Sequence, residues 1–71
     1  MGKRGGLLRN RIRDLREQAG GMNQQELADA VGITRQTVNA IEANKYSPSL
    51  EVACEISRVF KVPLEQVFQY G

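Results

Sequence analysis

Residues 24–41 read QQELADAVGITRQTVNAI, two short apolar patterns on either side of a single glycine. The apolar residues recur at helical spacing, so each pattern predicts a helix with one buried face, over residues 24–31 and 35–43. The inner residues of the pair are Leu27, Ala28, Val31, Ile33, Val38 and Ile41. Gly32 ends the first helix, because glycine takes positive φ angles without steric cost. The segment therefore predicts two helices joined by a tight turn.

Polar residues at the ends of both helices support this interpretation. Asn23 stands at an N-cap position, and Glu26 follows at the third helical position, as in a capping box. Thr34 is a favourable N-cap for the second helix. Asn44 follows that helix and tolerates the left-handed conformation that ends many helices.

Three further helical patterns flank the pair, over residues 7–19, 50–60 and 64–68, and no segment gives a convincing strand. Gly20 and Gly21 end the first of them. Their expected inner residues are Leu8, Ile12, Leu15 and Ala19, then Leu50, Ala53, Ile56, Ser57 and Phe60, and finally Val67 and Phe68. The sequence thus predicts an all-α protein of five short helices.

Length and charge restrict the partners of such a protein. A chain of 71 residues forms one domain, whose small core supplies only about 3–5 kcal/mol, so we expect a second copy to stabilise it. Residues 1–22 carry six basic and two acidic residues, a local net charge of +4. Nucleic acid or an acidic membrane surface would suit this end, and a solvated helix face would explain it equally. We expect residues 1–6 to form a flexible basic arm and residues 7–71 the folded domain.

Catalytic and metal-binding classes find little support. The chain has one cysteine and no histidine, which argues against a disulfide framework and against a metal site. No glycine-rich phosphate loop is present, and Glu51 and Glu55 lie one turn apart on a solvated face. We expect no enzyme and no cofactor. Cys54 is expected to be a half-buried small hydrophobe. Without a membrane-length apolar run or a secretion signal, the expected location is the cytoplasm.

The outward face of the second helix of the pair carries the residues best suited to chemistry. At about 100° per residue, four side chains point away from the core: Gln36, Thr37, Asn39 and Ala40. Arg35 stands at the open end of the helix. Arginine pairs with guanine and glutamine with adenine, and small apolar groups contact the thymine methyl. The pattern therefore favours a helix that enters the major groove of DNA, although a helical hairpin with a solvated polar face has the same spacing.

The run MNQQELADAVGITRQTVNAIEANKYSPSLEVA, residues 22–53, resembles the helix-turn-helix domain of phage repressors and Cro proteins, the Xre family. The motif positions that carry the resemblance are Gln24, Leu27, Ala28, Gly32, Val38, Ile41 and Glu42. Residues 47–68 match the last two helices of that family. Two departures stand out: the loop at Gly20 and Gly21 is one residue longer than usual, and Asn44 replaces a frequent glycine.

This resemblance implies a compact, lambda-repressor-like five-helix bundle that binds a palindromic operator in double-stranded DNA as a homodimer and regulates transcription, with repression as the expected mode. The implied base contacts are Arg35, Gln36, Thr37, Asn39 and Ala40. The implied phosphate contacts are Gln24, Arg16, Asn44 and Lys45. Arg16 is also implied to pair with Glu42.

The main alternative is an antitoxin-like or other protein-interaction module on the same fold. Such a module needs a second apolar surface, for which Val52, Val59 and Tyr70 are candidates. The same surface would serve a dimer, and the sequence alone does not separate the two uses.

Overall fold

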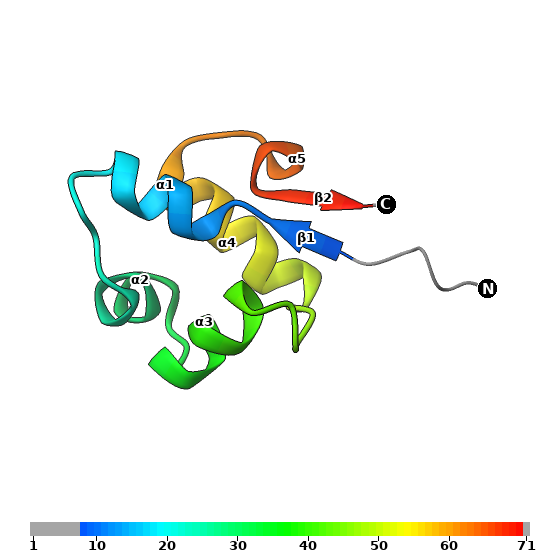
Figure 1. Ribbon diagram of the computed structural model, residues 1–71, viewed down its shortest axis with the longest axis horizontal. Coiled ribbons are helices and arrows are strands. Elements are labelled where there is room, and N and C mark those ends of the chain that lie inside the picture. Colours follow the sequence, from blue (N-terminus) through cyan, green and yellow to red (C-terminus); the bar gives the residue numbers. More distant parts are fainter. Residues whose placement is uncertain (1–7, 71) are drawn as a thin grey trace.

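The computed structural model describes residues 8–70, with side chains from residue 9 to residue 69. The elements are β1 (Leu8–Asn10), α1 (Ile12–Gln18), α2 (Gln24–Val31), α3 (Arg35–Glu42), α4 (Leu50–Phe60), α5 (Leu64–Val67) and β2 (Phe68–Tyr70) (Figure 1). The five helices predicted from the sequence are confirmed. The arm expected at residues 1–6 lies outside the described residues, as do Leu7 and the side chain of Tyr70.

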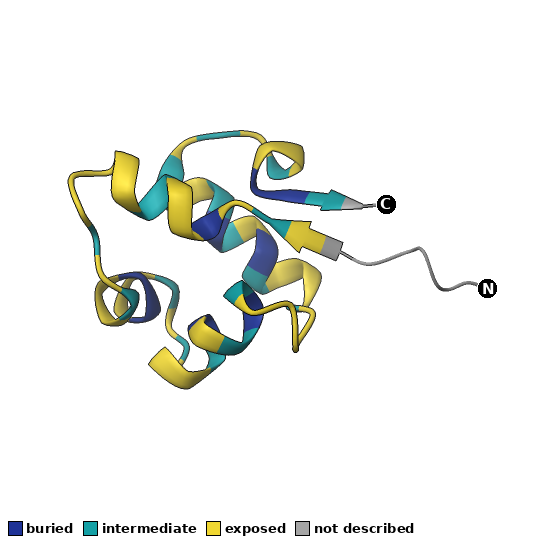
Figure 2. Cartoon of the chain, in the orientation of Figure 1, coloured by how far each residue is buried: buried dark blue, intermediate teal, exposed yellow. Residues whose placement is uncertain are grey.

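The core lies where α4 packs against α2 and α5, and α3 closes it from the side of α2 (Figure 1). The buried positions form dark stripes on the inner faces of the elements (Figure 2). They are Ile12, Leu27, Ala28, Val38, Ile41, Ala53, Ile56, Val67 and Phe68. Because every one is apolar, burial of these faces is what holds the helices together.

The ends of α2 and α3 follow the capping signals. The Asn23 side chain accepts from the Glu26 backbone N–H at 2.7 Å, and the Glu26 carboxylate accepts from the Asn23 N–H at 2.8 Å. Thr34 Oγ1 accepts from the Thr37 N–H at 3.1 Å. Asn44 has φ 60, so the predicted left-handed residue after α3 is confirmed, although α3 itself ends at Glu42, one residue earlier than expected.

We expect Gly32→Ala to lower the melting temperature. Gly32 has φ 86, and its N–H donates to the Ala28 carbonyl at 2.8 Å. A Cβ there would meet nothing within 4 Å, so the cost is backbone strain alone, about 1–2 kcal/mol. Thermal unfolding followed by circular dichroism should show a decrease of about 4–8 °C per kcal/mol. The reverse change, Lys61→Gly at φ 58, should not lower it. An unchanged melting temperature for Gly32→Ala would contradict the strained turn.

The prediction that no strand is present was wrong. β1 pairs antiparallel with β2, with Leu8 opposite Tyr70 and Asn10 opposite Phe68. The helix expected from residue 7 therefore begins only at Ile12, and the last helix stops before Phe68. The Asn10 side chain accepts from the Ile12 N–H at 3.1 Å and so starts α1 at that point. Local periodicity cannot reveal a strand whose partner lies at the other end of the chain.

Three side chains expected inside or half-inside are exposed. Ala19 lies just past the last residue of α1, where the chain turns into the two glycines. Leu50 is the first residue of α4 and extends beyond the edge of the core, with 71% of its surface exposed. Cys54 is exposed rather than half-buried.

Candidate nucleic-acid interface

Helix α3 has one face in the core and the opposite face open. Val38 and Ile41 are buried, whereas Arg35, Gln36 and Asn39 are exposed. The remaining two outward residues, Thr37 and Ala40, are half-buried. A polar face that the core does not use is therefore available along the whole helix.

Adjoining hollows follow this face of the molecule. One of ≈ 190 Å³ is lined by Gln24, Arg35, Gln36 and Asn39. Its neighbour of ≈ 220 Å³ shares Gln36 and is lined further by Thr34, Thr37, Ala40 and Tyr46. A third, of ≈ 380 Å³, is lined by Arg13, Arg16, Gln24, Asn39, Glu42 and Ala43. The surface beside α3 is thus concave over most of its length and lined by polar groups.

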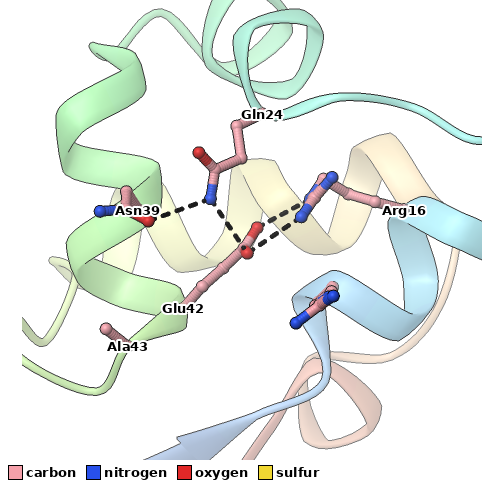
Figure 3. Close-up of a pocket in the computed structure, with 6 residues that line it drawn as sticks. Arg16, Gln24, Asn39, Glu42 and Ala43 are labelled. Carbon is pink, nitrogen blue, oxygen red and sulfur yellow. Dashed lines mark hydrogen bonds and ion pairs between the residues drawn. The ribbon is translucent and has the colours of Figure 1, made fainter.

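Arg16 of α1 and Glu42 of α3 form an ion pair at the base of the third hollow (Figure 3). Arg16 donates from Nε and Nη2 to the two carboxylate oxygens, at 2.7 and 3.0 Å. Its Nη1 donates to the Met22 carbonyl at 2.8 Å. The side chains keep only 12% and 10% of their surface exposed. The hydrogen bonds to Glu42 raise the pKa of the Arg16 guanidinium above its ordinary value, against the lowering effect of burial.

Gln24 extends this pair to the exposed side of α3. Its Nε2 donates to Glu42 Oε1 at 3.2 Å and to Asn39 Oδ1 at 3.3 Å (Figure 3). The first residue of α2 is therefore joined to two successive turns of α3. This bond helps to hold the two helices of the motif in one relative orientation.

Asn10 makes a further link at the C-terminal end of α3. Its Nδ2 donates to the Ile41 carbonyl at 2.8 Å and to Asn44 Oδ1 at 3.1 Å. Since Asn10 also holds the start of α1, it ties the first helix to the C-terminal end of α3. The sequence around Asn10 does not predict this role, because the partner residue Ile41 is 31 positions away.

The residues proposed from the sequence gather on one face, with one division among them. Of the nine proposed DNA contacts, seven line the hollows: Arg16, Gln24, Arg35, Gln36, Thr37, Asn39 and Ala40. Asn44 and Lys45 are exposed just past α3, outside these hollows. Arg13, one of the basic residues of the N-terminal segment and a possible phosphate contact by its charge, lines the third hollow. Tyr46 lines the second and was not among the candidates.

Residues 12–67 match the family described as Helix-turn-helix, which spans all five helices. The chain belongs to the Xre family of helix-turn-helix transcriptional regulators. This Xre-family protein is 46% identical over 61 residues to an uncharacterized HTH-type transcriptional regulator of Archaeoglobus fulgidus, covering 86% of each chain. It is 43% identical over 61 residues to the HTH-type regulator YgzD of Bacillus subtilis, covering 86% of this chain and 91% of YgzD.

A phage protein is similar as well. The transcriptional repressor RstR of cryptic phage CTXphi, from Vibrio cholerae, is 33% identical over 58 residues, covering 82% of this chain and 51% of RstR. The Xre-family protein is thus a transcriptional regulator whose helix-turn-helix is its DNA-binding domain. Within residues 8–70 no three potential metal ligands gather, and none of the helices described there is long and apolar enough to cross a membrane.

Proposed function

We propose that this Xre-family protein binds a palindromic DNA operator sequence-specifically as a homodimer and represses transcription in the cytoplasm by blocking access of the polymerase. The observation that carries the proposal is the open polar face of α3, whose exposed residues make no contribution to the core. A helix of this kind fits the major groove, while the preceding helix crosses the backbone.

The base contacts follow from the chemistry of this face. Arg35 and Gln36 lie exposed at the first turn of α3, where a guanidinium and an amide pair with guanine and adenine. Ala40 and Thr37 offer methyl groups for thymine, and Asn39 lies beside them. These five residues are the proposed base-contacting set, with their order along the operator open to measurement.

The phosphate contacts lie on either side of that set. The N-terminus of α2, at Gln24, favours a phosphate, because its first backbone N–H groups point outward and the helix dipole is positive there. Asn44 and Lys45 are exposed at the C-terminal end of α3 and complete the flank. Arg16 lies beneath the surface, so we assign it an electrostatic effect on the backbone together with its bond to Glu42.

A second copy of the chain is supported by large apolar side chains that the core leaves exposed. Leu50 and Tyr46 are large apolar residues that remain 71% and 55% exposed. Val52 and Val59, the earlier candidates for a second apolar surface, instead pack partly buried against the core. We propose that Leu50 lies in the dimer interface. The same exposed residues favour the alternative function, a module that binds another protein.

Selection of random duplex DNA by the purified protein tests the proposal, repeated with Arg35→Ala and Gln36→Ala. We expect a palindrome with half-sites about 10 bp apart. Each variant should relax one position per half-site at a cost of about 1–3 kcal/mol per contact. Gln66→Ala, an exposed amide on α5, is the matched control and should change nothing. If no sequence is enriched at moderate salt, specific binding is wrong and the protein-interaction module takes its place.

A further inference from the structure

We propose that Asn39 meets the DNA only as a hydrogen-bond donor, because a chain of hydrogen bonds that begins at Arg16 fixes the direction of its amide. This inference rests on the proposed function and deepens it by naming the chemistry of one contact. It concerns the four side chains Arg16, Glu42, Gln24 and Asn39, which follow one another across the third hollow (Figure 3).

Glu42 determines which end of each amide in this series of hydrogen bonds donates and which accepts. A carboxylate accepts hydrogen bonds and does not donate them, and both oxygens of Glu42 already accept from Arg16. The Gln24 amide lies 3.2 Å from one of these oxygens, so it must present its NH2 group there rather than its carbonyl. The opposite orientation would place two acceptors in contact.

The orientation of the Gln24 amide in turn determines that of the Asn39 amide. An NH2 group carries two hydrogens, and the second one of Gln24 is directed at Asn39, 3.3 Å away. Asn39 must therefore turn its oxygen toward Gln24. Its nitrogen then points away from the network and out of the hollow, as Figure 3 shows. Within the described residues the Asn39 nitrogen has no hydrogen-bond partner, so both of its hydrogens remain for a ligand.

This arrangement selects what Asn39 recognises. An asparagine that reads adenine uses both ends of its amide, accepting from N6 while it donates to N7. In this protein the accepting end is directed at Gln24 and the donating end points out of the hollow, so the amide presents its NH2 group to the DNA and its partner there is an acceptor. That acceptor is a phosphate oxygen, a purine N7, guanine O6 or thymine O4. Gln36, whose amide has no such restraint among the described residues, keeps both ends for a base.

Protein variants combined with DNA analogues distinguish an amide that only donates, as proposed for Asn39, from one that donates and accepts, as proposed for Gln36. The operator obtained by selection is remade with 7-deazapurine at single positions, which removes N7, with methylphosphonate at single linkages, and with purine in place of adenine, which removes N6. Guanine O6 and thymine O4 are removed in the same way, with 2-aminopurine in place of guanine and 5-methyl-2-pyrimidinone in place of thymine. For the Asn39 contact, one of the four acceptor substitutions (N7, O6, O4 or phosphate) should weaken the wild type about tenfold and Asn39→Ala not at all. The DNA substitution that weakens binding of the wild type identifies the acceptor. Removal of N6 should affect wild type and Asn39→Ala equally at every adenine.

Gln36→Ala is the positive control, since its loss should couple to both N6 and N7 of one adenine. Coupling of Asn39 to an N6 group would overturn the inference, and so would the absence of coupling to any acceptor. If selection yields no operator, the proposed function fails first. The methylphosphonate arm on random duplex then tests Asn39 by itself, with Gln66→Ala as the neutral comparison.

A measurement without DNA checks the chain of bonds directly. In the free protein the side-chain NH2 protons of Gln24 should exchange with water about 2- to 12-fold more slowly than those of exposed Gln66, as one hydrogen bond would cause. In Glu42→Gln the side chain at position 42 can present either an oxygen or an NH2 group to Gln24, so this protection should decrease. The melting temperature of the variant is measured separately. Equal exchange of Gln24 and Gln66 in the wild type would remove the basis for the restraint.

Discussion

Glu42→Ala should lower the free energy of unfolding by about 2–3 kcal/mol, most of what a core of this size supplies. The substitution leaves the Arg16 guanidinium largely buried without its carboxylate, and such a charge keeps its desolvation cost when its partner is lost. It also removes the acceptor of Gln24. Urea denaturation followed by circular dichroism measures the change.

Glu51→Ala is the matched control. Glu51 is exposed in the first turn of α4, where its only expected contribution is a favourable dipole interaction of about 0.3–1 kcal/mol. Equal losses for the two substitutions would show that the pair contributes no more than an exposed charge.

The contribution of Arg16 to the free energy of unfolding should not change with pH near neutrality. The folded state raises the pKa of Arg16 above an ordinary value that already lies far above neutrality, because the guanidinium donates to Glu42. Stability from a raised basic pKa is fully present below the unfolded value and is lost only as the pH rises through the folded one. The contribution of Arg16 is therefore constant over the range in which DNA binding is measured.

Leu27→Ala should unfold most of the protein at 25 °C and abolish DNA binding with it. Leu27 is 0% exposed on the inner face of α2, and truncation of a fully buried leucine costs about 2–5 kcal/mol through lost burial and the cavity left behind. Because this equals the expected total stability, few molecules would keep α2 and α3 in place.

Leu27→Met, which keeps the volume, should cost less than about 1.5 kcal/mol and retain binding. Circular dichroism and a binding titration with both variants give the comparison. A folded Leu27→Ala protein that binds DNA normally would mean that α2 tolerates a cavity at its contact with the rest of the core.

Features set by neighbouring residues were predictable from the sequence. The Asn23 and Thr34 caps act over three residues, and the inner faces of α2 and α3 repeat over one turn, so local patterns were sufficient. The outward face of α3 followed from the same geometry. Relations across the chain were not predictable in this way. β1 needs β2, and the exposure of Leu50 depends on where the other helices end.

The residues of the candidate site likewise fall into those that a local pattern predicts and those that depend on contacts across the chain. Arg35 and Gln36 could be chosen by their direction on one helix. The pairing of Arg16 with Glu42 rested on the family resemblance, and the orientation of Asn39 depends on three side chains from three helices. Asn10 contributes through a bond to a residue 31 positions away, for which the sequence carries no local signal, whereas Tyr46 lines the second hollow from the loop that follows α3.

The pairing of β1 with β2 also bears on the order in which the structure forms and opens. These strands lie at opposite ends of the described chain, so their contact closes the largest loop in the molecule and carries the highest entropic cost. The contacts between α2 and α3 are local and form early. We therefore expect the strands to join last and to separate first. Because Asn10 of β1 donates to the Ile41 carbonyl at the end of α3, we expect partial opening to begin beside α3 while α2 is still folded.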